Sequence, residues 1–355
     1  MGKITSKYTS KECCTINLQT ALKLYPFPEE IISSRMREVL KTGHPEMDII
    51  MQYLLDSSGK MLRPRLVYLT AAFYPHDPQI MKDTAVALEL IHLASLVHDD
   101  VIDQALTRRG KESMNSRWGN QTSVLAGDYL FATAFNLINR YGMPEVMDNV
   151  TRTIQLMCGG EIKQMALAYN LNTSEEDYLD KTFRKTACLF ASSCKVGSQI
   201  TSMPPEEADL LEQFGLCLGY AYQIIDDVLD YVSESSVLGK PAGNDLREGN
   251  ITLPLIVALK NDAYKPVLHQ LLDEPLDGLK LQQITGILIE SKAVEYSLSL
   301  SREFLNQALH NLDSLPENPA ARELRNLANY LMEGYYKGLI RLSPPTANKE
   351  VAGND

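Results

Sequence analysis

The chain has 355 residues, 45% of them hydrophobic, and a formal net charge of −11 at pH 7. This acidity argues against a general nucleic-acid binder, which would normally present a basic face. No uninterrupted apolar run reaches the roughly 18 residues of a membrane-spanning helix, so we expect no transmembrane segment. The first residues do not resemble a secretory signal, and the six cysteines show no ligand-like pairing with histidine. We therefore expect a cytoplasmic protein.

Helical periodicity dominates almost the whole chain, and clear strand-like alternation is missing. Clusters of proline and glycine divide the chain into apolar, helix-patterned runs. We predict one all-α domain over residues 16–343, with poorly ordered tails at 1–15 and 344–355. In chain order, the predicted core helices cover residues 85–103, 127–141, 145–169, 176–199 and 206–232, and shorter helices follow Pro254.

Two acidic clusters of the same pattern end two of these apolar runs. Positions four apart lie on one face of a helix, so the first and last aspartates of each cluster point the same way. Like charges at this spacing cost a helix about 0.2–0.5 kcal/mol. Their recurrence predicts oxygen ligands for divalent cations, above all Mg²⁺, held between two facing helices with a bound polyphosphate. The clusters are Asp99, Asp100 and Asp103, and Asp226, Asp227 and Asp230.

Basic side chains stand near the acids, where a diphosphate would need them. Lys60 and Arg63 precede an apolar helix, whose free N–H groups combine with cations to bind phosphate. His92 lies seven residues before Asp99 on the same stripe of the helix. Lys185 interrupts an apolar helix, where a lysine needs a partner. Further candidates are Arg108 and Arg109 after the first cluster, Thr186, and Lys240 and Arg247 after the second cluster.

Several of these residues have simpler explanations when each is taken alone. A single acidic cluster at a helix end is most often a solvated surface, and His92 alone is more often a satisfied core histidine. Arg108 and Arg109 alone would be an ordinary solvated pair. Asp128 and Gln164 fit either support of a metal site or hydrogen bonds between helices. The repeated acidic cluster and its basic neighbours together favour the metal and diphosphate interpretation.

Eight ordered blocks carry this chemistry. They are GKMLRP at 59–64, IHLASLVHDDVID at 91–103, TRRG at 107–110, AGDYL at 126–130, GGEIKQ at 159–164, RKTA at 184–187, YQIIDDVLD at 222–230 and GKPAGNDLREGNITLP at 239–254. Over about residues 30–340 the chain resembles the trans-prenyltransferases, the all-trans polyprenyl diphosphate synthases. The resemblance implies a single-domain, all-α isoprenoid-synthase bundle with a central cavity between helices that carry the two aspartate-rich motifs. It also implies head-to-tail condensation of isopentenyl diphosphate with an allylic diphosphate, assisted by Mg²⁺.

Carried over position by position, the resemblance implies a role for each candidate residue. The Mg²⁺ ligands would be Asp99, Asp103, Asp226 and Asp230, with Asp100 and Asp227 supporting catalysis. The isopentenyl diphosphate site would comprise Lys60, Arg63, His92 and Arg109. Contacts to the allylic diphosphate, or to the diphosphate that leaves it, would come from Arg108, Lys185, Thr186, Gln223 and Lys240. Of these cations, Arg108, Lys185 and Lys240 would also act in catalysis.

Small residues before the first acidic cluster bear on the length of the product. Members of this family with bulky aromatic residues at the positions of Ala94 and Ser95 stop elongation early, so the small residues here imply a medium- or long-chain prenyl product. Ala94 and Ser95 would also suit close packing of helices. The resemblance is closest to medium- and long-chain members, including the larger subunit of heptaprenyl-type enzymes. Departures from the family pattern are Ser58 and Met61, where many members have Gly and Arg, and Asn250, where many have lysine.

Three alternative functions remain open. The nearest is a short-chain farnesyl or geranylgeranyl synthase, which differs in the length of its product. A class I terpene cyclase also uses an aspartate-rich helix but normally lacks a second cluster of this form. A non-catalytic subunit of a heteromeric synthase tends to lose the acids that this chain keeps. The resemblance implies a homodimer and is compatible with a small partner subunit.

Overall fold

A computed structural model describes residues 27–56, 59–232, 243–273 and 275–340, with residues 332–340 described by their backbone alone. Over these residues the chain is almost wholly helical, which confirms the predicted all-α class. The predicted tails lie outside the described residues. No helix in the described part of the chain is long and apolar enough to cross a membrane.

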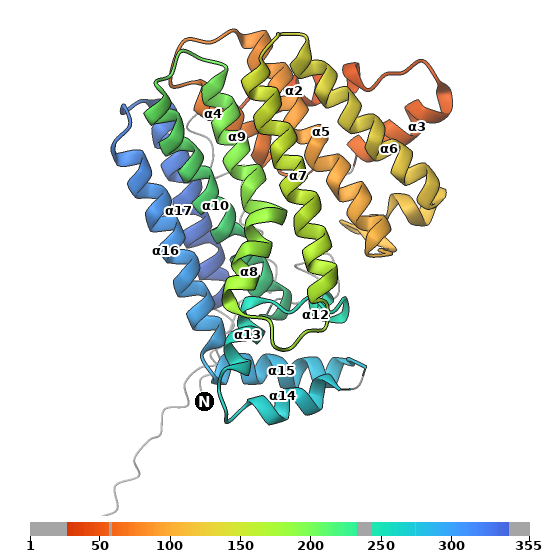
Figure 1. Ribbon diagram of the computed structural model, residues 1–355, viewed down its shortest axis with the longest axis vertical. Helices are drawn as coiled ribbons and strands as arrows, with labels where there is room; N and C mark the ends of the chain where they lie inside the picture. The colour runs from red at the N-terminus through yellow and green to blue at the C-terminus, as the bar shows by residue number, and fades with distance from the viewer. Residues whose placement is uncertain (1–26, 57–58, 233–242, 274, 341–355) are drawn as a thin grey trace, which may run out of the picture.

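The long helices run mostly lengthwise, and α14 and α15 lie across one end of the bundle (Figure 1). The segment between two of these helices forms a small antiparallel hairpin, with Thr107 opposite Glu112. The elements are α2 Glu29–Val39, α3 Pro45–Leu55, α4 Leu62–Ala71, α5 Pro78–Ile102, β1 Thr107–Arg108, β2 Lys111–Glu112, α6 Met114–Asn139, α7 Pro144–Leu167, α8 Glu175–Thr182, the π-helix η1 Phe183–Ala187, α9 Cys188–Gln199, α10 Pro205–Val232, α12 Asn244–Arg247, α13 Leu253–Leu259, α14 Lys265–Leu272, α15 Gly278–Glu290, α16 Ala293–Asp313 and α17 Pro319–Ile340.

The helix that carries the first acidic cluster, α5, begins at a well-formed cap. Asp77 accepts hydrogen bonds from the backbone N–H of Gln79 at 2.7 Å and of Ile80 at 3.4 Å. Pro78 occupies the first helical position, where its fixed φ fits and its missing N–H costs nothing. The apolar run then buries most of the helix against α6 and α4.

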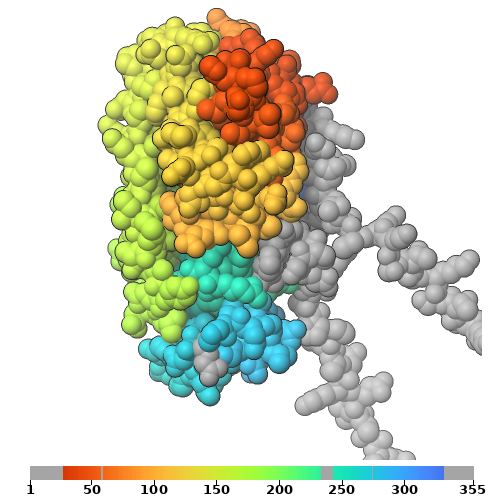
Figure 2. Space-filling view, turned by 90° about the vertical axis from the view of Figure 1, so that its right-hand side faces the viewer, coloured from red at the N-terminus to blue at the C-terminus, as the bar shows by residue number. Residues whose placement is uncertain are grey.

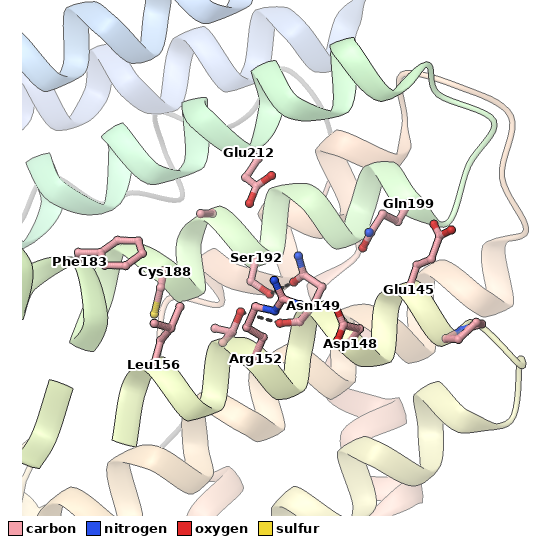
Figure 3. A pocket seen from close by; sticks show the side chains of 13 residues that line it. Glu145, Asp148, Asn149, Arg152, Leu156, Phe183, Cys188, Ser192, Gln199 and Glu212 are labelled. Atoms are coloured by element: carbon pink, nitrogen blue, oxygen red, sulfur yellow. Dashed lines mark hydrogen bonds and ion pairs between the residues drawn. The ribbon is translucent and has the colours of Figure 1, made fainter. Parts of the chain in front are cut away.

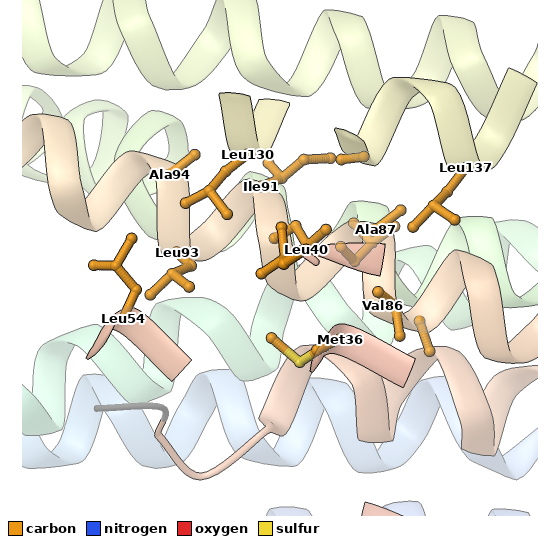
Figure 4. Packing of buried hydrophobic residues seen from close by; sticks show 14 of the residues in the cluster. Met36, Leu40, Leu54, Val86, Ala87, Ile91, Leu93, Ala94, Leu130 and Leu137 are labelled. Carbon is orange, nitrogen blue, oxygen red and sulfur yellow. The ribbon is translucent and has the colours of Figure 1, made fainter. Parts of the chain in front are cut away.

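The buried side chains form three clusters, and the two acidic helices belong to different ones. The first joins α2, α3, α5 and α6, and in Figure 4 Ala94 of α5 lies near Leu130 of α6, whereas Leu93 of α5 lies near Leu54 of α3. The second joins α4, α9, α10, α16 and α17. The third packs α13 and α15 against α8 and the last part of α10. The helices α4 and α9, which contact each other, therefore lie where the first two clusters meet.

One glycine allows the close approach of α9 to α4. A Cβ on Gly197 would lie 2.0 Å from Oγ1 of Thr70 and 2.5 Å from the carbonyl oxygen of Val67. No larger residue fits there without moving a backbone. At the other end of the same pair of helices, the guanidinium of Arg63 lies 4.9 Å from the ring centre of Phe190.

A buried ion pair fastens α2 to α5. The guanidinium of Arg35 contacts the carboxylate of Asp83 twice, with Nε to Oδ1 at 2.8 Å and Nη2 to Oδ2 at 3.1 Å. Tyr141, just after α6, donates its hydroxyl to the same carboxylate at 2.6 Å. This network ties three segments of the first core together.

Candidate active site

The first acidic cluster combines two half-buried aspartates with a buried one. Asp99 and Asp103 lie one turn apart at the end of α5 on a partly exposed face. Asp100 is buried and accepts a hydrogen bond from Nε of Arg108 at 2.6 Å. Burial raises the pKa of Asp99 to about 7, and the charge of Asp103 adds to this shift. A carboxylate that is costly to ionise alone is stabilised by a nearby cation.

The π-helix between α8 and α9 carries Lys185 and Thr186. Such wide turns occur frequently at functional sites. Nζ of Lys185 lies 2.8 Å from Oε2 of Glu161, a buried residue of α7. Burial alone would lower the pKa of Lys185, but the charges of Asp99 and Glu161 outweigh it and raise the pKa. The ammonium group is therefore charged and lies beside the first acidic cluster.

The second acidic cluster is held by a buried network. Asp227 accepts hydrogen bonds from the hydroxyl of Tyr178 and from Nε2 of Gln223, both at 2.7 Å. Thr186 donates in turn to Oε1 of Gln223 at 2.8 Å. Burial raises the pKa of Asp227 to about 7, and the charge of Asp245 adds to it. Two residues predicted to contact the allylic diphosphate, Thr186 and Gln223, thus belong to one hydrogen-bonded chain.

Asp226 and Asp230 share a helix but differ in burial. Asp226 is exposed, whereas Asp230 is fully buried and accepts the backbone N–H of Asp245 at 3.1 Å. Both acidic clusters lie at the C-terminal ends of their helices, where the helix dipole disfavours negative charge. A bound cation would offset this cost.

Lysines on α8 and η1 link the two clusters electrostatically. Lys185 interacts with Asp99 and Asp103 of the first cluster. Lys181, four residues earlier, interacts with Asp227 of the second. The two lysines therefore connect residues of the first cluster with a residue of the second.

A set of cations gathers around His92. Burial holds the pKa of His92 well below its ordinary 6.5, and the charges of Arg63 and Arg109 add to this effect. The imidazole is therefore neutral. Lys60, in the segment before α4, is exposed. The structure thus brings together Arg63, His92 and Arg109, which the sequence assigned to one diphosphate site.

The β1–β2 hairpin places the two arginines that follow the first acidic cluster (Figure 2 shows the side of the molecule formed by α3, the hairpin and α6). Its turn residues, Arg109 and Gly110, have left-handed φ values of 52° and 75°, as a two-residue hairpin turn requires. Gly59 makes room for the first of them, because a Cβ there would lie 2.5 Å from Nη2 of Arg109. The hydroxyl of Tyr53 donates to the carbonyl of Glu112 at 2.7 Å and fixes the hairpin to α3.

The two small residues assigned to product length lie in different surroundings. Ala94 is fully buried in the first core, with no exposed surface. Ser95 is half-buried and donates its hydroxyl to the carbonyl of His92 at 2.8 Å. Ser95 is also one turn from Asp99, so it belongs to the partly exposed face of α5, whereas Ala94 lies beside Leu130 of α6 in the core (Figure 4).

Three further candidates have plain outcomes. Gln164 donates to Oε1 of Glu161 at 3.3 Å within its own helix. Asp128 is exposed, and its Oδ1 lies 3.7 Å from Nε2 of His98 on α5, which favours the explanation of a contact between helices. Lys240 lies outside the described residues.

Sequence reasoning missed Glu161, Tyr178 and Lys181. Glu161 lies within a quoted block and shares a helical face with Gln164, a spacing that could have drawn attention to it. Tyr178 and Lys181 stand in no quoted block, and only the fold brings them to the second cluster.

A hollow of about 570 Å³ lies elsewhere, between α7 and α9 with Glu212 of α10 at its edge (Figure 3). None of the predicted site residues lines it. Among the described residues, no three His, Cys, Asp or Glu side chains converge closely enough to hold a metal ion by themselves. The donor chemistry of Asp99 and Asp103 still fits a divalent cation, because carboxylate oxygens are hard ligands and a cation relieves the cost of their burial.

Two aspartate-rich helix ends, with lysine and arginine side chains beside them, define a helical enzyme that acts on diphosphates. The chain belongs to the polyprenyl synthetase family, whose profile matches residues 44–287. It is an enzyme of the trans-prenyltransferase type, a polyprenyl diphosphate synthase that elongates prenyl chains. This membership decides against a terpene cyclase and confirms the isoprenoid-synthase fold.

The chain is 40% identical over 279 residues to heptaprenyl diphosphate synthase component 2 of Geobacillus stearothermophilus, covering 79% of this chain and 87% of that one. It is 33% identical over 311 residues to a short chain isoprenyl diphosphate synthase of Methanothermobacter thermautotrophicus, covering 86% and 95%. The crystal structure of a decaprenyl diphosphate synthase from Rhodobacter capsulatus matches with a TM-score of 0.81 at 32% identity, covering 86% and 96%.

Proposed function

We propose that the enzyme condenses isopentenyl diphosphate head-to-tail with an allylic diphosphate to give a medium- or long-chain all-trans polyprenyl diphosphate. The observation that carries this proposal is the position of Lys185 beside Asp99 and Asp103, while its neighbour Thr186 is hydrogen-bonded through Gln223 to the second cluster. Groups that bind an anion and groups that bind cations thus meet at one place.

The allylic diphosphate would be held there by its charge. Mg²⁺, when bound by Asp99, Asp103 and the second cluster, supplies Lewis-acid charge neutralisation. Lys185 and Arg108 place positive charge where the leaving diphosphate develops its own negative charge, which favours breaking of the allylic C–O bond. The double bond of isopentenyl diphosphate attacks the resulting carbocation, and the released diphosphate accepts the proton that is then lost.

Isopentenyl diphosphate would bind to the second set of cations. Arg63 and Arg109 supply charge, and His92 is neutral, so its ring can donate a hydrogen bond without adding a third charge. The buried apolar face of α5 would keep water from the carbocation, which water would otherwise quench.

The product length is supported by the relatives and by the small residues of α5. The relative from Geobacillus stearothermophilus is named heptaprenyl diphosphate synthase component 2, and buried Ala94 is a small residue at a position where, by the family resemblance, a bulky aromatic stops elongation early. The 33% identical short chain synthase favours the alternative of a shorter product. Ala94→Phe tests the point: we expect shorter products by mass spectrometry, and an unchanged distribution would contradict the assignment of Ala94.

Assembly is the next part of the proposal. The name of the same relative, component 2, supports a partner subunit for this chain as well. Exposed apolar side chains on α6 and α7, among them Leu125, Ile162 and Met165, are a surface that self-association would cover. We propose that the chain forms a homodimer. The name of the relative suggests an alternative assembly, in which the chain pairs with a small partner subunit.

The test is incubation of the purified chain with Mg²⁺, isopentenyl diphosphate and farnesyl diphosphate, followed by mass spectrometry. Elongated products that vanish in excess chelator are the expected result. Turnover that persists in chelator would end the metal part of the proposal. If the chain alone is inactive and regains activity on addition of the partner subunit, the enzyme is of the two-component kind.

A further inference from the structure

Lys181 is a buried cation to which neither the sequence patterns nor the proposed reaction assigns a role. It lies at the end of α8 and is 8% exposed. Its ammonium group donates to the side-chain oxygen of Asn250 and lies 5.4 Å from the ring centre of Tyr178. Lysine is almost never buried to this extent unless it is paired with an opposite charge. Within the described residues, the hydrogen-bond partner of Lys181 is instead a neutral amide.

The position of Lys181 relates it to both acidic clusters. The charge of Asp227 attracts it from the second cluster and that of Asp245 from α12, while near the first cluster Lys185 repels it and Glu161 attracts it. Burial lowers the pKa of Lys181, and the two aspartates only partly oppose this effect. A cation in these surroundings gains from a further anionic ligand.

The ammonium group has capacity for such a ligand. It carries three N–H donors, of which Asn250 takes one. A small hollow of about 10 Å³, large enough for about one water molecule, is lined by Lys181, Asn250 and Gln164. The flexible lysine stem lets the ammonium leave Asn250 without any movement of the helix.

We propose that Lys181 is a further diphosphate-binding residue, whose ammonium contacts the diphosphate of the allylic substrate and then the released pyrophosphate. Asn250 holds the ammonium in place when no diphosphate is bound. The inference rests on the proposed function, because it assigns one more cation to the same diphosphate. The competing explanation is that Lys181 has only a structural role and holds residues 249–251 against α8.

The experiment compares Lys181→Met with the wild type. Binding of inorganic pyrophosphate in the presence of Mg²⁺ is measured by calorimetry, and the KM values for farnesyl diphosphate and isopentenyl diphosphate are measured by kinetics. We expect pyrophosphate affinity to fall and the KM for farnesyl diphosphate to rise by about tenfold or more, as for a lost charge-assisted hydrogen bond. The KM for isopentenyl diphosphate should stay within about twofold, since its cations are separate.

Lys163→Met is the matched control. Lys163 also fastens α8, through Asp180 at 2.9 Å and Asp177 at 3.2 Å, but it is not part of the site. Its loss should leave pyrophosphate binding unchanged. If Lys181→Met binds pyrophosphate as tightly as the wild type, Lys181 is only a structural pin and the inference is wrong.

A double variant covers the case in which Lys181→Met fails to fold. Lys181→Met combined with Asn250→Lys returns an ammonium group from the other side of the same contact. We expect pyrophosphate affinity within about threefold of the wild type, because a lysine binds phosphate as a point charge. Pyrophosphate binding about tenfold weaker in this folded variant would overturn the inference. A wild type that binds pyrophosphate but forms no elongated product would contradict the proposed function and leave the role of Lys181 standing.

Discussion

Gly59→Ala is expected to weaken the binding of isopentenyl diphosphate and to spare the allylic substrate. The added Cβ would lie 2.5 Å from Nη2 and 2.8 Å from Cζ of Arg109. Non-bonded heavy atoms normally approach no closer than about 3.5 Å, so the guanidinium has to move by about 1 Å. Gly59 itself has no left-handed φ, so its backbone accepts alanine.

The size of the effect follows from this displacement. A shift of 1 Å in a group that positions a reactant can cost up to about a hundredfold in rate. The arginine stem is flexible and absorbs part of the shift. We therefore expect the KM for isopentenyl diphosphate to rise about tenfold, or about 1.4 kcal/mol. The KM for the allylic diphosphate should change by less than about twofold, because the contacts proposed for it, Lys185 and Arg108, do not include Arg109.

Steady-state kinetics with each substrate varied in turn provide the measurement. Gly286→Ala is the matched control, because a Cβ at that position of α15 meets no other atom within 4 Å. It should leave both KM values unchanged. An unchanged KM for isopentenyl diphosphate in folded Gly59→Ala, or an equal rise for both substrates, would refute the reasoning.

Three predictions concern stability. Asp83→Asn removes the buried charge that joins α2 to α5, but half-buried Arg35 keeps its ion pair with Glu38, so the change should cost about 1.5–3 kcal/mol in urea unfolding. Burial raises the pKa of Asp83, but the hydrogen bonds from Arg35 and Tyr141 outweigh this effect, so the pKa lies below the ordinary 3.8. The stabilisation that Asp83 contributes is therefore present above pH 3.8 and is lost as the pH falls below it. The Asp83→Asn variant should lack this acid dependence. Tyr178→Phe removes a hydrogen bond to buried Asp227 and should cost about 1.5–3 kcal/mol; an unchanged unfolding midpoint would contradict this. Gly197→Ala forces a Cβ against Thr70 and should lower the melting temperature by circular dichroism, through overpacking of about 1–3 kcal/mol.

The fold class could be predicted from the sequence because the apolar period of each helix is local. The predicted helix 206–232 agrees with α10 to within a residue. The predicted helix 127–141 begins earlier, at Met114, because Ser113 caps it and the chain continues through Gly119 despite its non-helical φ of 81°. The predicted helix 176–199 is interrupted by η1, since a π-helix leaves no period in the sequence.

The candidate site could be predicted where a residue's role depends on spacing along one helix. Asp99 and Asp103 lie on one face, as their spacing indicates. Asp226 and Asp230 have the same spacing, yet α12 covers Asp230 and leaves Asp226 exposed. Which aspartate is buried depends on elements distant in the sequence, and so does the hydrogen bond that Asp227 accepts from a tyrosine of α8.

The π-helix has a consequence for how the enzyme tolerates change. Residues 175–199 form one continuous rod, and its wide turn at Phe183–Ala187 holds one residue more than a regular turn. Five residues of such a turn cover about the same rotation as four residues of an α-helix, so α8 and α9 keep nearly the register of an unbroken helix. The wide turn therefore sets the directions of Lys185 and Thr186, which lie inside it, without displacing the helices on either side. A deletion that restored a regular turn should move these two side chains and leave the rest of the bundle in place.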